Sequence, residues 1–179
     1  MLRCKKKNCK VISFEPSVFN LEILCRNIFV NKINKNVTVF SLPLSDNIKE
    51  SFFNMSNTEL GGAISTFGEN FTYDGSKLDM VFRYKTFSIN MDKFVESFKV
   101  PYPKYIKIDV DGIEHLILKQ SLNVLKKAKE ILIEVDEKFK KQKMEIAFIL
   151  KKSGYKLLSR EPLNVDKKEK IFNQLWVKN

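Results

Sequence analysis

Short apolar runs alternate with segments of helical spacing along most of the chain, and this alternation is typical of an α/β fold. The runs predict strands at residues 10–15, 37–42, 51–55, 81–89, 105–108, 130–135, 155–159 and 171–177. Apolar residues three and four apart predict helices from residue 18 to the Asn- and Lys-rich stretch at 31–36, and over 91–98, 113–127 and 138–152. Strands that lead into helices indicate βαβ units with parallel strands. With 179 residues, the chain is expected to form one domain, residues 1–179.

The stretch KYIKIDVDGIEHLILK at residues 104–119 is where the pattern changes most abruptly. Its apolar run at residues 105–108 predicts a strand buried on both faces, and helical spacing resumes at Ile113. In open α/β sheets, ligands bind at the carboxyl ends of the strands. Asp109 and Asp111 are therefore expected at the ligand-binding edge.

Glu15 occupies a similar place at the end of the first strand, just before a helix that Ser17 is expected to cap. In nucleotide-binding α/β folds, an acidic residue here accepts hydrogen bonds from both ribose hydroxyls. The alternative is a solvated glutamate at a strand end.

These two stretches, VISFEPS at residues 11–17 and the one at residues 104–119, resemble the FkbM family of S-adenosylmethionine-dependent methyltransferases. The resemblance covers about residues 10 to 158. It implies a Rossmann-like class I methyltransferase sheet, mostly parallel with an antiparallel C-terminal edge. It also implies S-adenosyl-L-methionine as cofactor and a hydroxyl of a small molecule or sugar as methyl acceptor.

The resemblance assigns the cofactor's ribose to Glu15 and places Ser45 and Asp46 beside the adenine. Asp46 can equally be an ordinary turn residue next to Asn47. The segment 58–77, rich in Gly, Ser, Thr and Asn, is interpreted as a mobile segment over the site, with a plain surface loop as the alternative.

Methyl transfer needs an aligned acceptor and a group that removes its proton. Asp109 ends a strand that is predicted to be buried, where an unpaired charge is costly, so we expect it closest to cofactor and acceptor. Glu114 and His115 are candidates for the general base. Alternatively, Asp111 and Glu114 have the spacing of a capping box, and His115 lies exposed on a first helical turn. 

We predict no metal. The cysteines form no C-x-x-C pair, which argues against zinc, and a magnesium ligand set cannot be deduced from two carboxylates.

The family normally begins with a strand that leads into a glycine-rich turn beside the cofactor's methionine end. No such segment precedes Val11. We therefore expect an N-terminally truncated domain that lacks the first, central strand of the sheet.

The net charge of +11 is compatible with a nucleic-acid partner. However, the lysines are spread along the chain, so solvated faces explain the charge better than a specific nucleic-acid site.

No apolar run approaches the roughly 20 residues of a membrane span, and no signal peptide is recognisable, so a cytoplasmic protein without membrane partners is expected. Two alternatives to a methyltransferase stay open, a nicotinamide-dependent oxidoreductase that uses Glu15 for ribose binding, and a degenerate or truncated binding module. The pattern does not predict an oligomeric state.

Overall fold

The computed structural model of this protein describes residues 9–163 and 170–178. Its strands are β1 (Val11–Phe14), β2 (Val37–Phe40), β3 (Lys49–Met55), β4 (Ser65–Phe67), β5 (Phe82–Ser88), β6 (Tyr105–Ile108), β7 (Glu130–Asp136), β8 (Lys156–Pro162) and β9 (Ile171–Val177). Its helices are α1 (Val18–Val30), α2 (Met91–Phe98), α3 (Glu114–Lys119), α4 (Leu122–Lys127) and α5 (Lys140–Lys152). The predicted strands are all present within a few residues of their expected limits, and the α/β prediction is confirmed.

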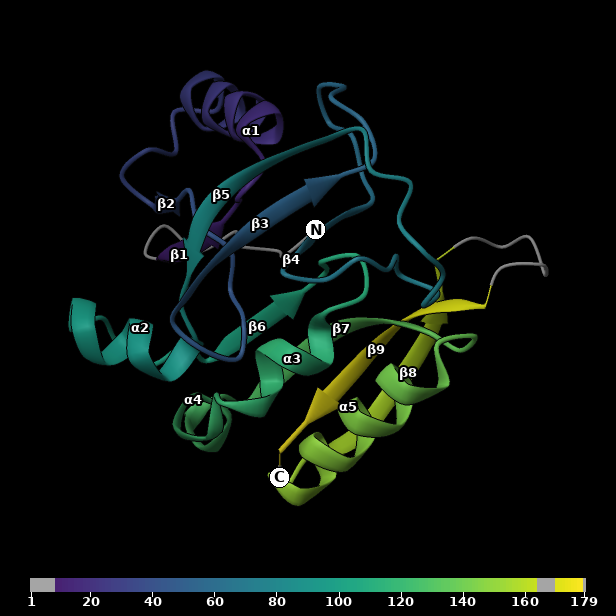
Figure 1. Ribbon diagram of the computed structural model, residues 1–179. Coiled ribbons are helices and arrows are strands. Elements are labelled where there is room, and N and C mark those ends of the chain that lie inside the picture. The colour runs from purple at the N-terminus through teal and green to yellow at the C-terminus, as the bar shows by residue number, and fades with distance from the viewer. Residues whose placement is uncertain (1–8, 164–169, 179) are drawn as a thin grey trace.

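The described strands form three sheets and not one continuous, mostly parallel sheet (Figure 1). β1 pairs in parallel with β2, and β6 pairs in parallel with β7. β9 then runs antiparallel to both β7 and β8, as expected for the C-terminal edge. The third sheet, in the order β4-β3-β5, is entirely antiparallel. The architecture is therefore mixed. Within the described ranges, no strand is hydrogen-bonded to the second edge of β1 or of β6.

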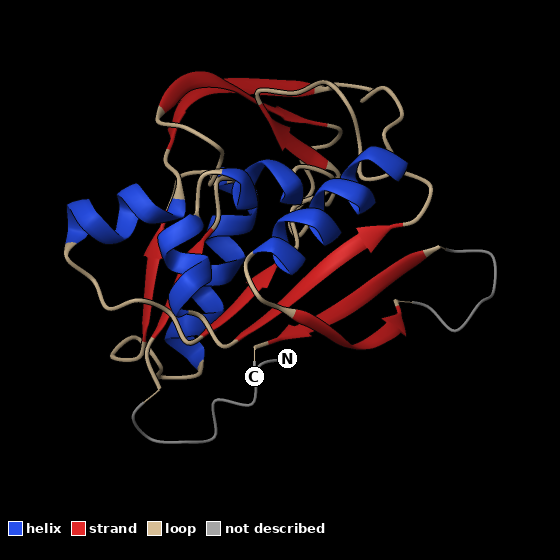
Figure 2. Ribbon diagram, turned by 90° about the horizontal axis from the view of Figure 1, so that it is seen from below, coloured by secondary structure: helices blue, strands red, loops and turns tan. Residues whose placement is uncertain are grey.

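Helices α3, α4 and α5 lie between the four-stranded sheet and the three-stranded sheet (Figure 2), whereas α1 lies beside β5 (Figure 1). The inner face of the four-stranded sheet supplies core residues such as Ile131, Ile133 and Trp176, which confirms the core position predicted for Trp176. The prediction that β6 is buried on both faces is wrong. Ile108 is 4% exposed, whereas Tyr105 on the opposite face is 56% exposed, because the packing helices cover only the inner face.

The structure has two helices, α3 and α4, in place of the single helix predicted for residues 113–127. Ser121 lies at the break, and its hydroxyl donates to the carbonyl of Ile117 (2.7 Å). The carboxylate of Asp92 on α2 accepts hydrogen bonds from two first-turn amides of α4, at 2.8 and 2.7 Å. These capping contacts come from a distant part of the chain, and they stabilise a new helix start that periodicity alone does not reveal.

Within residues 9–163 and 170–178, no helix combines the length and apolar character that crossing a membrane requires.

Candidate functional site

The turn after β1 holds Glu15 in a defined position. Ser17 caps α1 as predicted, since its hydroxyl accepts from the amide of Asn20 (3.3 Å). Glu15 Oε1 in turn accepts from the amide of Ser17 (2.9 Å). The hydroxyl of Tyr84 on β5 donates to the carbonyl of Pro16, so the three-stranded sheet lies against this turn. Burial raises the pKa of Glu15, and the Ser17 amide offsets part of that rise.

The turn after β6 is held by Asp111 and by segment 58–77. Asp111 has a left-handed backbone (φ 55°). Its Oδ2 accepts hydrogen bonds from the amides of Ile64 and Ser65, at 2.8 and 3.1 Å. The pKa of Asp111 is raised, chiefly by burial, although both amides favour the ionised form. The predicted capping box is therefore wrong, because Asp111 bonds to segment 58–77 instead of to the first turn of α3.

Gly112 explains how that segment can approach so closely. Its φ is 120°, and a Cβ at this position would lie 2.7 Å from the carbonyl oxygen of Thr72. Only a residue without a side chain fits this contact and this conformation. Segment 58–77 therefore packs directly on the turn of residues 109–112. It contains β4, a strand that its polar composition had not predicted.

Glu114 supports the same turn from inside the protein. It is 2% exposed, and its carboxylate accepts from the amides of Val110 and Gly112, not from the amide of Asp111 three residues back as a capping box requires. The side-chain amide of Gln142 on α5 donates a third hydrogen bond. Burial raises the pKa of Glu114 to about 7, against the lowering effect of the backbone amides.

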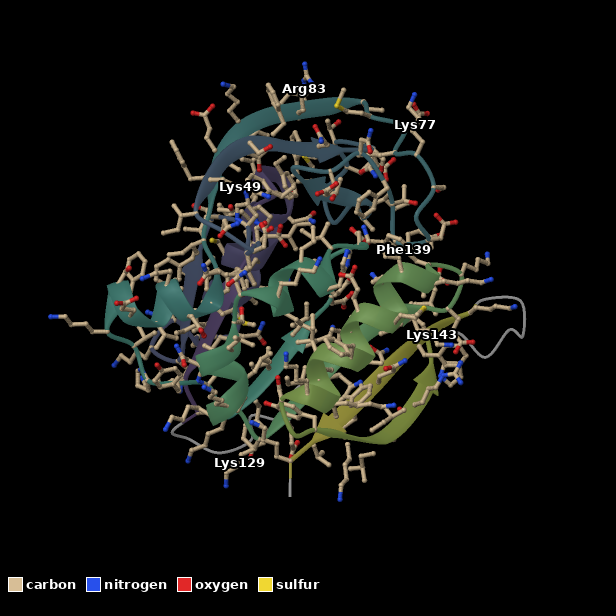
Figure 3. The ribbon with its side chains drawn as sticks, turned by 60° about the horizontal axis from the view of Figure 1, so that its bottom comes forward. Lys49, Lys77, Arg83, Lys129, Phe139 and Lys143 are labelled. Atoms are coloured by element: carbon tan, nitrogen blue, oxygen red, sulfur yellow. The ribbon has the colours of Figure 1, made fainter. Side chains whose placement is uncertain are left out.

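His115, the next residue, is also buried and is 1% exposed. The alternative that His115 lies exposed on the first helical turn is therefore wrong. Burial lowers its pKa, and its ring meets the edge of Phe139 at a centroid distance of 5.9 Å. Phe139, labelled in Figure 3, precedes α5 and also contacts Phe71 of segment 58–77. His115 is thus part of the packing under the turn.

Asp109 directly follows β6, and Glu134 lies near the carboxyl end of the neighbouring strand β7. The burial expected for Asp109 is wrong, because its side chain is 42% exposed and pairs with Lys107 at 2.7 Å. The pKa of Glu134 is raised to about 7, mainly by burial and further by the charges of Asp109 and Asp111. Sequence reasoning missed Glu134, although the alternating residues EILIEV place it on a strand face one residue beyond the position paired with Ile108.

Together these acids form one group that joins two separate sheets. Asp111 acts electrostatically on Glu15 from one side, and Asp109 acts on Asp111 from the other. Glu134 interacts with both aspartates. Segment 58–77 connects the two turns, since Asn20 on α1 bonds to Gly61 and Gly62, and Asp111 accepts from Ile64 and Ser65.

Ser45 and Asp46 form a separate turn. The Ser45 hydroxyl donates to Asp46 Oδ1 (3.0 Å), and Lys49, labelled in Figure 3, pairs with the same oxygen at 3.0 Å. Burial alone would raise the pKa of Asp46, but Lys49 and Ser45 outweigh it and lower the pKa. These contacts are those of a turn residue, and a place beside adenine stays a prediction for this pair.

Comparison with known proteins identifies the family. The family model described as Methyltransferase FkbM domain matches residues 3–157. The chain belongs to the FkbM methyltransferase family. 

The resemblance seen in the sequence is thereby confirmed. The crystal structure of Methyltransferase FkbM from Methylobacillus flagellatus KT is similar to this FkbM chain, with a TM-score of 0.61 and 15% sequence identity. The similarity covers 94% of this chain and 36% of that chain, so this chain spans about a third of that protein's length. At this identity the likeness concerns the fold. A search of curated proteins found no match.

The chemistry available in this FkbM chain is that of carboxylates at a sheet edge. In the described ranges, no group of three or more His, Cys, Asp or Glu residues is arranged to hold a metal ion. Glu15, Asp109 and Glu134 can accept hydrogen bonds from hydroxyl groups, attract a cation or take up a proton.

Proposed function

We propose that this FkbM domain is an S-adenosylmethionine-dependent methyltransferase that methylates a hydroxyl oxygen of a small molecule or sugar. Membership of the family supports methyl transfer in general. The observation that supports the finer proposal is that segment 58–77 is hydrogen-bonded both to the start of α1, beside Glu15, and to Asp111, beside Asp109. A cationic nucleoside cofactor needs a hydrogen-bond acceptor for its ribose and negative charge near its sulfonium, and the carboxylates of Glu15 and Asp109 offer both.

The donor set fits the cofactor. One carboxylate oxygen of Glu15 is held by the Ser17 amide, which fixes the side chain and leaves the second oxygen for ribose hydroxyls. When bound, S-adenosylmethionine supplies an electrophilic methyl group on a sulfonium. We assign to Asp109 the position closest to the acceptor, since its exposed carboxylate can accept a hydrogen bond from the acceptor's hydroxyl.

Glu114 and His115 receive a different role from the general base that the sequence suggested. Both are buried, and the carboxylate of Glu114 is engaged by two backbone amides and Gln142. We therefore propose that they position the turn that carries Asp109 and Asp111.

Isothermal titration calorimetry with S-adenosylmethionine tests the cofactor proposal. We expect the wild type to bind, and Glu15→Gln to bind about ten-fold or more weakly, because a charge-assisted hydrogen bond is replaced by a neutral one. The control is Glu22→Gln, which alters an exposed glutamate on α1 that pairs with Arg26. Binding of NADH in place of S-adenosylmethionine would favour an oxidoreductase, because Glu15 can hold the ribose of either cofactor.

The acceptor class is tested with methyl-labelled S-adenosylmethionine and a panel of sugars and small alcohols. Transfer to a hydroxyl gives an ether, which survives mild base, whereas a methyl ester is hydrolysed. Base-stable label in the product supports the proposal. Label that is released by mild base, or recovered on an amine, contradicts it.

A further inference from the structure

Glu134 lies at the proposed cofactor edge but has no role so far. In the parallel ladder of β6 and β7, Ile108 is paired with Ile133, so Asp109 and Glu134 follow side by side. This register brings two carboxyl groups next to each other on the same face of the sheet. Two neighbouring carboxyl groups can share a hydrogen bond when one of them holds a proton. The pair therefore has a protonated state and a fully ionised state.

The groups around Glu134 favour retention of that proton at neutral pH. Burial is the largest cause of its raised pKa of about 7, followed by the charges of Asp109 and Asp111, and Lys107 opposes them. On the other side, β9 presents the neutral Asn173 as the paired residue. A cation that arrives at this edge would add to Lys107 and favour ionisation.

We propose that Glu134 makes the site discriminate between the sulfonium of S-adenosylmethionine and the neutral thioether of S-adenosylhomocysteine. The sulfonium favours the fully ionised pair of Glu134 and Asp109, whereas the thioether does not. Because the coupling is reciprocal, ionisation of the pair strengthens binding of the sulfonium relative to the thioether. This inference rests on the proposed function, and it concerns which form of the cofactor is retained.

The test is the ratio of the dissociation constants of S-adenosylhomocysteine and S-adenosylmethionine, measured by calorimetry at about pH 6 and about pH 8. In the wild type we expect the ratio to rise roughly two- to five-fold between these pH values, which corresponds to a lowering of the pKa of Glu134 by about half a unit to one unit. In Glu134→Gln the rise should disappear. A slope that comes from ionisation of the ligands themselves would persist in this variant.

The matched control is Glu130→Gln. Glu130 lies on the same face of β7, four residues earlier, or about 13 Å along the strand. We expect it to keep the wild-type slope. A flat ratio in the wild type, or an equal rise in Glu134→Gln, overturns the inference while binding of S-adenosylmethionine still supports the proposed function. Failure of the wild type to bind either molecule overturns both.

A second measurement needs no variant. The carboxyl carbon of Glu134, observed by NMR in protein labelled with carbon-13 glutamate, reports its protonation directly. We expect saturation with S-adenosylmethionine to lower its pKa and saturation with S-adenosylhomocysteine to leave it near the value of the free protein. Equal pKa values in the two complexes would refute the inference.

Discussion

The buried carboxyl of Glu114 should make the stability of this protein depend on pH, and Glu114→Gln should remove that dependence. Glutamine has the same shape, and its carbonyl oxygen can still accept from the amide of Gly112. Its NH₂ group can donate to Gln142 Oε1, a buried atom for which no hydrogen bond is found among the described residues, once the Gln142 amide rotates. The substitution therefore removes an ionisable group with little change in packing.

The size of the effect follows from the pKa of Glu114, which burial raises from 4.5 to about 7. The folded state then binds this proton more tightly than the unfolded state. Its contribution to stability is fully present below the unfolded pKa and is lost as pH rises through the folded pKa. The loss amounts to about 3 kcal/mol between about pH 4.5 and about pH 7.5. For a chain of this length it corresponds to roughly 6 to 12 °C in Tm.

The assay is urea unfolding of wild type and variant, followed by circular dichroism from about pH 5 to about pH 8. The difference between the two proteins cancels the titration of groups that both contain. As the pH is raised from about 5 to about 8, the free energy of unfolding of Glu114→Gln minus that of wild type should increase by most of the roughly 3 kcal/mol expected above. A difference that stays constant across this range would falsify the reasoning.

Glu145→Gln on α5 serves as a control, because the pKa of Glu145 is shifted in the opposite direction from that of Glu114. Burial alone would raise the pKa of Glu145, but the ion pair with Lys119 outweighs burial and lowers it. The stabilisation from this carboxylate is present above its unfolded pKa of about 4.5 and is lost only at more acidic pH. The difference between Glu145→Gln and wild type should therefore be flat from about pH 5 to about pH 8.

Two further substitutions test the contact between the Asp109 turn and segment 58–77. Gly112→Ala should lower the free energy of unfolding by about 2 to 4 kcal/mol in thermal denaturation, because its Cβ meets Thr72. As a control, Gly154→Ala, which also has a positive φ (86°) but whose Cβ would make only an ordinary 4.0 Å contact with the Lys178 side chain, should cost only about 1 kcal/mol. In Asp111→Asn, asparagine can adopt the positive φ, but its neutral side chain accepts the two hydrogen bonds from the amides of segment 58–77 more weakly. Proteases should therefore cleave segment 58–77 several-fold faster, at about the same Tm. Unchanged cleavage would contradict the role given to Asp111.

The secondary structure was largely predictable because apolar periodicity records which residues face the core. The places of Glu15 and Asp109 directly after β1 and β6 were predictable for a related reason, since each follows a short apolar run. The break between α3 and α4 was not predictable, because the residue that caps α4, Asp92, lies about thirty residues earlier in the chain. Likewise, the burial of His115 depends on Phe139 and α5, which local spacing does not report.

Asp111 shows why the site itself was only half predictable. From spacing alone it is a helix cap, because a carboxylate two residues before a helix usually binds first-turn amides. The positive φ directs it instead to the amides of Ile64 and Ser65, a choice made by tertiary contacts.

Burial is the main cause of the raised pKa values of Glu15, Glu114 and Glu134, and the charge of Asp111 adds to each rise. If segment 58–77 moves away, Asp111 loses the two hydrogen bonds that favour its ionised form, while exposure to water favours that form by removing the cost of burial. In water its charge is also screened, so its repulsion of the three glutamates weakens and their pKa values fall. Attachment of the segment and protonation of the site are therefore thermodynamically linked, and conditions that ionise Glu134 also favour release of the segment.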